Sequence, residues 1–306
     1  RMKLKRALLD NLDKNYNFDV PQGLVDAEYK SIVNQYEQDK KYHPLDESET
    51  AKSEEELLAE YALVAQKISP ERVVFRTLDV GADKMLHAQA ALKEPNPALG
   101  LRGIRFCLRH QGIFRTQLRA LMRAGVYGNV AIMLPMVSAM DEVQQVRRIM
   151  QELHQELAAQ NLPHAPLLPL GVMVETPAAA LICDALAREC DFFSIGTNDL
   201  IHYIMGIDRN NRHVAYLNEP LHPAVVRSLK HIIDAAHREG IGVSVCGELA
   251  SDPFGLALLL GMGVDTVSAA PRFVPGMKHI IRQFNAQACM DLANSVLLST
   301  DRKSVV

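Results

Sequence analysis

The stretch FFSIGTNDL at residues 192–200 joins a short apolar run to a glycine, three polar residues and a new apolar pattern. Such a run is typical of a buried parallel strand, and its carboxyl end would present Asn198 and Asp199 to a site. Three further runs reach polar side chains in the same way, namely VMVET at 172–176, VSVCGE at 243–248 and VVFRTLD at 73–79. We therefore expect several strand ends to deliver acidic, basic, amide and thiol groups to one rim of a sheet.

Strand-like and helix-like segments alternate from residue 72 onward. The expected strands are 72–78, 101–105, 130–135, 169–174, 191–195, 242–246 and 264–268. The expected amphipathic helices between them include 139–160, 178–189, 222–239 and 254–261. Alternating units with single apolar runs predict an α/β fold in which helices cover a parallel sheet. Polar residues at the strand ends favour a (β/α)8 TIM-type barrel over an open sheet, although seven strands are recognisable rather than eight.

Residues 1–66 have a different character, because they are highly charged and poor in strand signals. Apolar residues recur there at helical spacing. Ser53 and Glu56 form a capping-box pattern ahead of one such apolar face. We expect a short helical region at 1–66, the barrel at 70–290 and a tail at 291–306.

The composition is that of an ordinary globular protein, with 306 residues, 48% of them hydrophobic, and a formal charge of -3. This near-neutral balance gives no argument for nucleic-acid binding. No apolar run approaches the ~18 residues of a membrane span, so we expect no membrane partner. The five cysteines include no Cys-x-x-Cys pair, which predicts a reducing, cytoplasmic setting without a zinc site.

Glu175 and Asp199 are the candidate metal ligands. Carboxylate oxygens suit Mg²⁺, which takes few protein carboxylates and completes its shell with water and substrate oxygens. The alternative is that both are structural acids at strand ends, bonded to helix N-termini. Asn198 is a candidate donor to a phosphate or carboxylate oxygen, and its alternative role is turn formation.

Arg76, Arg102 and Arg209 are the candidate substrate-binding residues, because guanidinium groups bind phosphate and carboxylate bidentately. Arg209 follows Asp208, so a surface ion pair is the alternative there. Cys246 is a candidate proton donor or acceptor, with a buried packing thiol as the alternative. Together these groups suit a barrel enzyme that handles a phosphorylated acid.

Five strings resemble, in order, the phosphoenolpyruvate-binding barrel of Enzyme I of the bacterial sugar phosphotransferase system. They are FRTLDVGADK at 75–84, NPALGLRGIR at 96–105, GVMVETPAAA at 171–180, DFFSIGTND at 191–199 and CGELA at 246–250. The resemblance covers residues 70–285. Pyruvate phosphate dikinase and phosphoenolpyruvate synthase have related barrels, but the strings at 74–84 and 192–200 are more similar to Enzyme I.

The resemblance implies an enzyme that transfers the phosphoryl group of phosphoenolpyruvate to a histidine on a separate domain and releases pyruvate. The substrate-binding residues that it implies are Arg76, Arg102, Asn198, Asp199 and Arg209. Glu175 and Asp199 would ligate Mg²⁺, and Cys246 would protonate C3 of the enolpyruvate. The resemblance also implies a homodimer formed through the barrel.

The sequence departs from the family pattern in two ways. The family's first barrel strand carries a Gly-x-x-Arg-Thr-Glu-Phe string, which is not found in this sequence, so we expect a barrel that lacks its first strand. None of the eleven histidines lies in the Thr-Ser-His setting of the family's phosphohistidine domain. The chain is thus expected to bind phosphoenolpyruvate, while a full-length parent supplies the phosphohistidine domain and the site for the phosphocarrier protein.

Residues 1–66 resemble part of the C-terminal domain of trigger factor, a ribosome-associated chaperone. The strings that carry this resemblance are KRALLD at 5–10, FDVPQGLVDAE at 18–28 and KSEEEL at 52–57. An alternative function is therefore a chaperone-like, polypeptide-binding helical region fused to a remnant barrel. A third interpretation is a barrel like those of pyruvate phosphate dikinase or phosphoenolpyruvate synthase. The enzyme interpretation includes the case in which this fragment binds its substrate but is inactive alone.

Overall fold

The computed structural model of this chain describes residues 52–79, 96–208 and 211–299. These residues belong to one compact unit, Thr50–Val306. Within it, six parallel strands form a single sheet whose strand order follows the chain. The strands are β1 (Val73–Arg76), β2 (Val130–Leu134), β3 (Leu170–Val174), β4 (Phe192–Gly196), β5 (Gly242–Cys246) and β6 (Thr266–Ser268).

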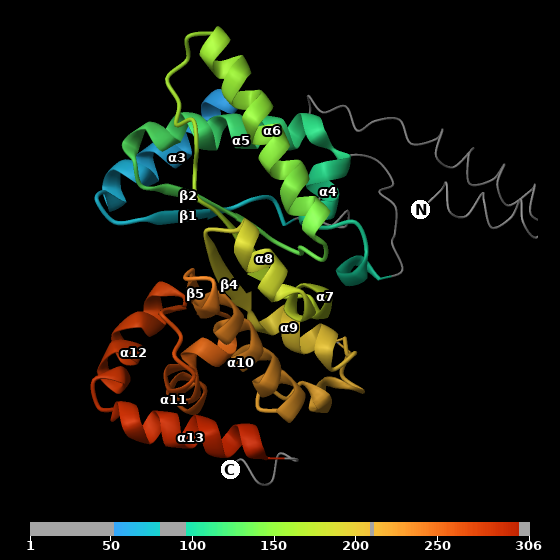
Figure 1. Ribbon diagram of the computed structural model, residues 1–306, viewed down its shortest axis with the longest axis vertical. Coiled ribbons are helices and arrows are strands. Elements are labelled where there is room, and N and C mark those ends of the chain that lie inside the picture. Colours follow the sequence, from blue (N-terminus) through green and yellow to red (C-terminus); the bar gives the residue numbers. More distant parts are fainter. Residues whose placement is uncertain (1–51, 80–95, 209–210, 300–306) are drawn as a thin grey trace, which may run out of the picture. The chain divides into compact units, whose positions relative to one another are not determined.

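Helices lie between the strands along the chain and cover the sheet (Figure 1). The α-helices are α3 (Glu54–Ile68), α4 (Ile104–Arg109), α5 (Gln111–Ala124), α6 (Met140–Ala159), α7 (Pro177–Leu181), α8 (Cys183–Glu189), α9 (Thr197–Ile204), α10 (Pro223–Arg238), α11 (Pro253–Gly261), α12 (Val274–Ile281) and α13 (Ala286–Leu298). Short 3-10 turns are η1 (Pro97–Leu99), η2 (Gly125–Tyr127), η3 (Ala215–Leu217), η4 (Glu248–Ser251) and η5 (Pro271–Phe273). None of the helices in the described ranges has both the length and the apolar character that crossing a membrane requires. The expected α/β fold is confirmed.

Six of the seven expected strands are present, and the expectation for residues 101–105 is wrong. This segment leads into α4, which begins at Ile104. Gly103 has a φ of 57°, a left-handed conformation that interrupts an extended chain. Ile104 and Cys107 are both buried, one helical turn apart. The apolar residues of this segment therefore follow helical spacing rather than strand spacing.

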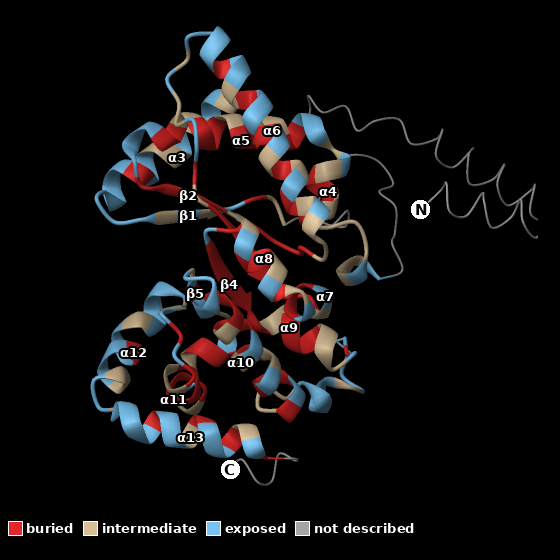
Figure 2. Cartoon of the chain, viewed as in Figure 1, coloured by how far each residue is buried: buried red, intermediate tan, exposed pale blue. Residues whose placement is uncertain are grey.

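The middle strands form the most buried layer of the unit (Figure 2). Every residue of β3 and β4 is buried, as expected for parallel strands covered by helices. Helix α10 packs on β4 and β5, and α5 packs on β2. In the sheet register, Val174 lies beside Ile195 and Gly196 lies beside Cys246. The carboxyl ends of β3, β4 and β5 are therefore level at one edge of the sheet.

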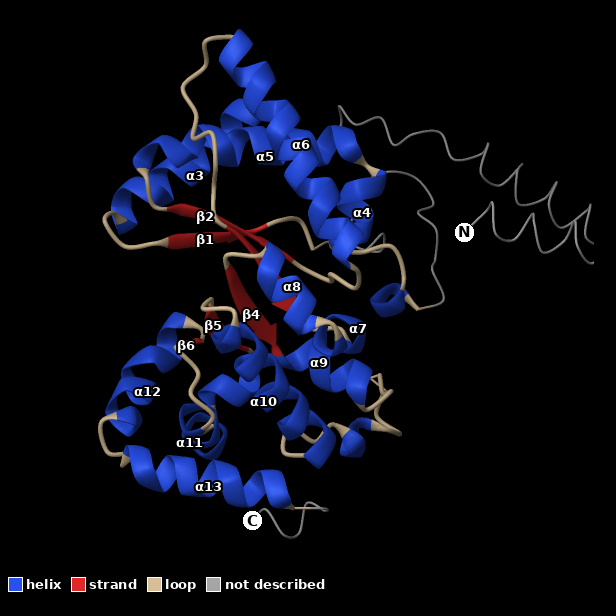
Figure 3. Ribbon diagram, in the orientation of Figure 1, coloured by secondary structure: helices blue, strands red, loops and turns tan. Residues whose placement is uncertain are grey.

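The sheet turns strongly along its strand order. In Figure 3, β1 and β2 run across the view whereas β4 runs down it. A right-handed twist between neighbouring strands accumulates in this way in parallel sheets. The turn brings the ends of strands that are not neighbours, such as β1 and β5, toward a common space, where both contribute residues to one pocket.

Helix α3 belongs to this α/β unit, although the sequence grouped residues up to 66 with the N-terminal region. It packs against α5 and contacts β1. The expected capping box is confirmed, since the Glu56 N–H donates to Ser53 Oγ at 3.3 Å and the Ser53 N–H donates to Glu56 Oε2 at 2.8 Å. The rest of the expected helical region, residues 1–51, lies outside the described residues.

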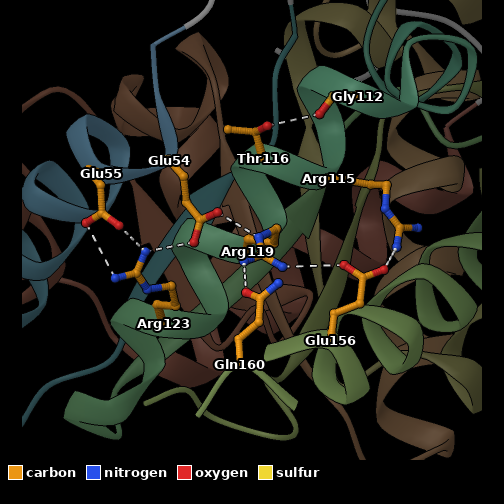
Figure 4. Close-up of polar contacts among 9 residues, drawn as sticks. All are labelled: Glu54, Glu55, Gly112, Arg115, Thr116, Arg119, Arg123, Glu156 and Gln160. Atoms are coloured by element: carbon orange, nitrogen blue, oxygen red, sulfur yellow. Dashed lines mark hydrogen bonds and ion pairs between the residues drawn. The ribbon is translucent and has the colours of Figure 1, made fainter. Parts of the chain in front are cut away.

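Arginines of α5 join α3 on one side to α6 on the other (Figure 4). Arg119 Nε donates to Glu54 Oε2 at 2.6 Å, and Arg123 Nη1 donates to Glu54 Oε1 at 2.8 Å. Arg119 Nη1 also lies 3.4 Å from Glu156 Oε2 on α6. Burial alone would raise the pKa of Glu54, but the two arginines bring it below its usual value. These contacts fix α3 to the helical layer.

Asn129 ties the end of α3 to the start of β2, and we expect Asn129→Ala to destabilise the protein by about 2 kcal/mol. Its Nδ2 donates to the carbonyl oxygens of Ala65 and Glu71, both at 2.9 Å, and the residue is 8% exposed. The substitution leaves these carbonyl groups without that donor. Urea unfolding measures the change, with Gln66→Ala as the control because it removes an exposed hydrogen bond to Tyr127. An equal loss of stability in both variants would contradict the prediction.

Helix α13 covers residues 286–298, so residues 291–298, expected as the start of a tail, are helical instead. The helix packs on α11 and buries Cys289, Ala293 and Val296. Gly261 of α11 permits this close approach, because an added Cβ would lie 1.9 Å from the carbonyl oxygen of Cys289. Residues 300–306 of the expected tail lie outside the described residues.

Candidate active site

A pocket of about 820 Å³ lies where the carboxyl ends of four strands meet. Its lining includes the last residues of β1, β4 and β5, which are Arg76, Gly196 and Cys246. Glu175, directly after β3, also lines it. Because the strands are parallel, these ends share one edge of the sheet, where α/β proteins commonly bind ligands. The other walls come from residues 96–102 and from α9 with the turn that follows it.

The structure brings six of the seven predicted site residues to this one pocket. They are Arg76, Arg102, Glu175, Asn198, Asp199 and Cys246. The seventh, Arg209, lies outside the described residues. Its placement stays a prediction, as do the chemical roles of the other six.

Arg76 and Arg102 both pair with Asp79, which follows β1. Arg102 donates through Nε and Nη2 to the Asp79 carboxylate at 2.9 to 3.2 Å, and its Nη2 lies 3.3 Å from Asp199 Oδ2. Arg76 Nη1 lies 3.4 Å from Asp79 Oδ2, and its side chain is 48% exposed. Burial alone would lower the pKa of Arg102, but the carboxylates of Asp79 and Asp199 raise it above its usual value. The pocket therefore holds two permanent positive charges.

Glu175 is the most buried acid of the pocket, at 2% exposure. Its Oε1 accepts a hydrogen bond from the Met136 N–H at 2.7 Å. Gly196 gives the carboxylate its space, since an added Cβ there would lie 2.6 Å from Glu175 Oε2. Burial, with the negative charges of Asp199 and Asp79, raises the pKa of Glu175 to about 8, despite the Met136 N–H bond. A cation close to Glu175 would reverse this effect.

Asn198 and Asp199 lie in the first turn of α9, directly after β4. Asn198 Oδ1 accepts from the backbone N–H of Glu248 at 3.1 Å, which links this turn to the end of β5. Gly247 has a φ of 105°, and an added Cβ there would lie 2.9 Å from Asn198 Oδ1. A glycine is required at this position because a side chain would be strained in its backbone and would collide with the amide.

Cys246 ends β5 and places a half-buried thiol at the pocket. Its Sγ lies 3.5 Å from the carbonyl oxygen of Ile195, and the hydroxyl of Ser194 lies 3.9 Å from the same sulfur. Burial raises the pKa of Cys246 above its usual value, although Ser194 acts in the opposite direction. Thr197 Oγ1 donates to the carbonyl oxygen of Cys246 at 2.7 Å, which fixes the strand end. A raised pKa favours the protonated thiol, which is the form that a proton donor must have.

The pocket residues to which the sequence gave no role include Asp79, His202 and Tyr203. Asp79 is recognisable as an acid after a strand, but no spacing rule pairs it with Arg102, which lies 23 positions later. Tyr203 lies four residues after Asp199, which is one turn along α9. Helical spacing from Asp199 is therefore a signal by which Tyr203 could have been found.

The pocket's acids fit a magnesium ion by their chemistry. Glu175 and Asp199 both line the pocket, and each carries hard carboxylate oxygens. Burial, together with the charges of Asp199 and Asp79, raises the pKa of Glu175, and a divalent cation beside it would favour its ionised form. The described parts of the chain contain no cage of three or more His, Cys, Asp or Glu residues. Mg²⁺ does not need one, because it binds through one or two carboxylates together with water and substrate oxygens.

Curated proteins with similar sequences carry the name phosphoenolpyruvate-protein phosphotransferase. The proteins from Bacillus sp. (strain S) and Geobacillus stearothermophilus are each 44% identical over 254 residues, which is 83% of this chain and 44% of the relative. The chain thus spans less than half the length of these relatives. Among solved structures, the Haloferax volcanii malate synthase lead(II) complex gives a TM-score of 0.50 at 12% identity, over 74% of this chain and 59% of that one. That likeness concerns the fold alone.

Two family models match the sequence. The model for the C-terminus of bacterial trigger factor protein matches residues 1–69, in agreement with the resemblance of the N-terminal region. The model described as "PEP-utilising enzyme, PEP-binding domain" matches residues 43–286, so the two matches overlap over residues 43–69. The second match spans most of the chain and every residue of the pocket. The chain therefore belongs to the family of PEP-binding domains of PEP-utilising enzymes.

Proposed function

We propose that this chain is the phosphoenolpyruvate- and Mg²⁺-binding catalytic barrel of a phosphoenolpyruvate-protein phosphotransferase. The reaction transfers the phosphoryl group of phosphoenolpyruvate to a histidine on a separate domain and releases pyruvate. The observation that carries the proposal is a single pocket, at the ends of parallel strands, that is lined by Arg76, Arg102, Glu175, Asp199 and the thiol of Cys246. The 44% identity to proteins named for this reaction supports it further.

Arg76, Arg102 and Asn198 are the proposed substrate-binding groups, together with Asp199 and Arg209. Phosphoenolpyruvate carries a phosphate and a carboxylate, and both are anions that a guanidinium fork binds bidentately. Arg76 is the more exposed of the two described cations and is suited to meet the incoming phosphate. Arg102 is held by Asp79, so it offers its charge with little loss of side-chain entropy.

Glu175 and Asp199 are the proposed ligands of Mg²⁺. When bound, the ion would offset the negative charge of the phosphoryl and enol oxygens during transfer. The Met136 N–H bond and the space beside Gly196 hold Glu175 at the pocket, where its carboxylate could bind the ion. Asp199 would bind the metal and would also contribute to substrate binding, because its Oδ2 lies 3.3 Å from Nη2 of Arg102, a proposed substrate-binding residue.

Cys246 is the proposed acid of the reaction. The bond between phosphorus and the enol oxygen breaks as the histidine nitrogen takes the phosphoryl group, and the electron pair of that bond stays on the oxygen. As the enolate collapses to the ketone, the Cys246 thiol gives its proton to C3 and becomes a thiolate. The phosphorylated imidazole releases its N–H proton to water, and water returns a proton to the sulfur, so the protons balance. Burial keeps the thiol protonated at the start, as this sequence requires.

The proposed setting follows from the same likeness to longer relatives. The six-stranded sheet would be part of a (β/α)8 barrel at 70–290, preceded by the trigger-factor-like region at 1–66 and followed by a tail. The proposed partners are phosphoenolpyruvate, pyruvate, the phosphohistidine domain and phosphocarrier protein of a full-length parent, and a second barrel in a homodimer. The proposed compartment is the cytoplasm.

The proposal predicts saturable, Mg²⁺-dependent binding of phosphoenolpyruvate, which isothermal calorimetry would measure with and without the ion. Arg76→Ala is expected to weaken binding by about 2 kcal/mol, because one charge-assisted contact is lost. Arg188→Ala is the matched control, since Arg188 pairs with Glu239 at the surface and does not line the pocket. A folded wild-type chain that binds nothing, with or without Mg²⁺, would sink the enzyme interpretation and leave a remnant barrel.

A further inference from the structure

Tyr203 connects two walls of the pocket. It lies on α9, and its hydroxyl donates to the carbonyl oxygen of Ala98 in η1. The hydroxyl oxygen of Tyr203 also lies 3.9 Å from Met136 Sδ. Residues 96–99 and Arg102 line the pocket, and segment 96–102 ends in Arg102. The tyrosine therefore bridges the helix that carries Asp199 to the segment that carries Arg102.

Several backbone hydrogen bonds of segment 96–102 are local. Within it, the Leu99 N–H donates to Asn96 O and the Gly100 N–H donates to Pro97 O. Arg105 on the adjoining helix reaches the Leu99 and Gly100 carbonyls at 3.3 and 3.4 Å. The Tyr203 hydroxyl adds a bond from a distant part of the chain, 105 residues away in sequence. A bond of this kind restricts the whole segment, whereas the local ones move with it.

Arg102 depends on where this segment lies. Its guanidinium reaches Asp79 on one side and Asp199 on the other, and the contact to Asp199 is the longer, at 3.3 Å. Tyr203 also lies close to the Arg102 guanidinium. Burial raises the pKa of the Tyr203 phenol, and the positive charge of Arg102 acts to lower it. If the segment moved away from α9, Arg102 would keep its partner Asp79 and lose its place beside Asp199.

We propose that Tyr203 is a positioning residue, which holds segment 96–102 against α9 and so keeps the Arg102 guanidinium beside Asp199, ready for an anionic substrate. The proposal rests on the proposed function for the identity of that substrate. Its physical basis is preorganisation, because an arginine already in place loses less entropy on binding than one that must be ordered. The role requires the hydroxyl and not the ring.

The first test is phosphoenolpyruvate binding by Tyr203→Phe in the presence of Mg²⁺. We expect three- to tenfold weaker binding from the loss of one hydrogen bond, with only a small decrease in thermal stability. Tyr127→Phe is the matched control, because its hydroxyl accepts a bond from Gln66 on the helix layer and does not line the pocket. Equal affinity of Tyr203→Phe and wild type would overturn the proposal.

A double-substitution cycle separates positioning from direct contact. If Tyr203 acts through Arg102, Tyr203→Phe is expected to change affinity by less than twofold when Arg102 is already alanine. A full three- to tenfold effect in the Arg102→Ala background would show that the hydroxyl acts independently, and the positioning role would be wrong.

Limited trypsin digestion tests the same role without any ligand. Trypsin cleaves after arginine, and segment 96–102 is followed closely by Arg105. We expect Tyr203→Phe to be cleaved several-fold faster after Arg102 and Arg105, as identified by mass spectrometry, while Tyr127→Phe is cleaved like the wild type. If the wild type does not bind phosphoenolpyruvate, the proposed function fails. The digestion still tests whether Tyr203 holds segment 96–102 in place. Unchanged cleavage after Arg102 would overturn the positioning role.

Discussion

Cys246→Ala is expected to slow the exchange of the C3 protons of pyruvate by about 10²- to 10⁴-fold, the usual contribution of a positioned acid or base. Exchange is the reverse of the proposed proton transfer, in which the sulfur takes a proton from C3 and returns one from solvent. It needs no phosphoryl acceptor, so this chain can be tested by itself. The substitution removes the thiol at the end of β5, whereas the bond from Thr197 Oγ1 to the backbone carbonyl stays.

Proton NMR in D₂O with Mg²⁺ and pyruvate would follow this exchange, and calorimetry would follow phosphoenolpyruvate affinity in parallel. We expect affinity to change by less than threefold, because the thiol is uncharged and adds little to anion binding. Cys183→Ala is the matched control, since that thiol is buried in α8 and does not line the pocket. Exchange in Cys246→Ala at the wild-type rate would assign the proton transfer to another group.

The proposed site was largely predictable from the sequence because it lies at strand ends. Glu175, Asn198 and Cys246 each follow a short apolar run, and parallel strands place such positions at one edge. The strands themselves were recognisable because β3 and β4 are buried throughout and therefore continuously apolar. Short apolar runs therefore predicted six of the strands and the edge of the sheet at which the candidate site residues lie.

Residues whose roles depend on tertiary contacts were not predictable in the same way. Arg102 was selected for its guanidinium, but its segment was assigned to a strand. A run as short as GLRGIR does not let periodicity separate a strand from a helix. Gly103, with its φ of 57°, decides against the strand, and no sequence rule gives that angle. Likewise, the contact between Tyr203 and Ala98 joins residues 105 positions apart, so it exists only in the folded chain.

Metal-free protein carrying Glu175→Gln is expected to be more stable than the wild type at pH 8, by an amount on the order of 3 kcal/mol. In the folded wild type the pKa of Glu175 is about 8, against a usual value of 4.5, because burial and neighbouring carboxylates disfavour the charged form. The folded state therefore binds the proton more tightly than the unfolded state. The stability that protonated Glu175 contributes is fully present below pH 4.5 and is lost as the pH rises through 8. Glutamine stays uncharged at every pH, so the variant does not lose this stability.

Urea unfolding at pH 5 and pH 8, in a chelator, would measure the difference, with Glu248→Gln as the control because that side chain is exposed beside the same pocket. Glutamine still accepts the Met136 N–H bond, so its effect isolates the charge. Adding Mg²⁺ at pH 8 is expected to stabilise the wild type and not Glu175→Gln, since a ligand that binds only the folded state raises its stability. Equal pH dependence in the two proteins would mean that Glu175 is ionised without a cation. The charge argument for the proposed magnesium site would then fail.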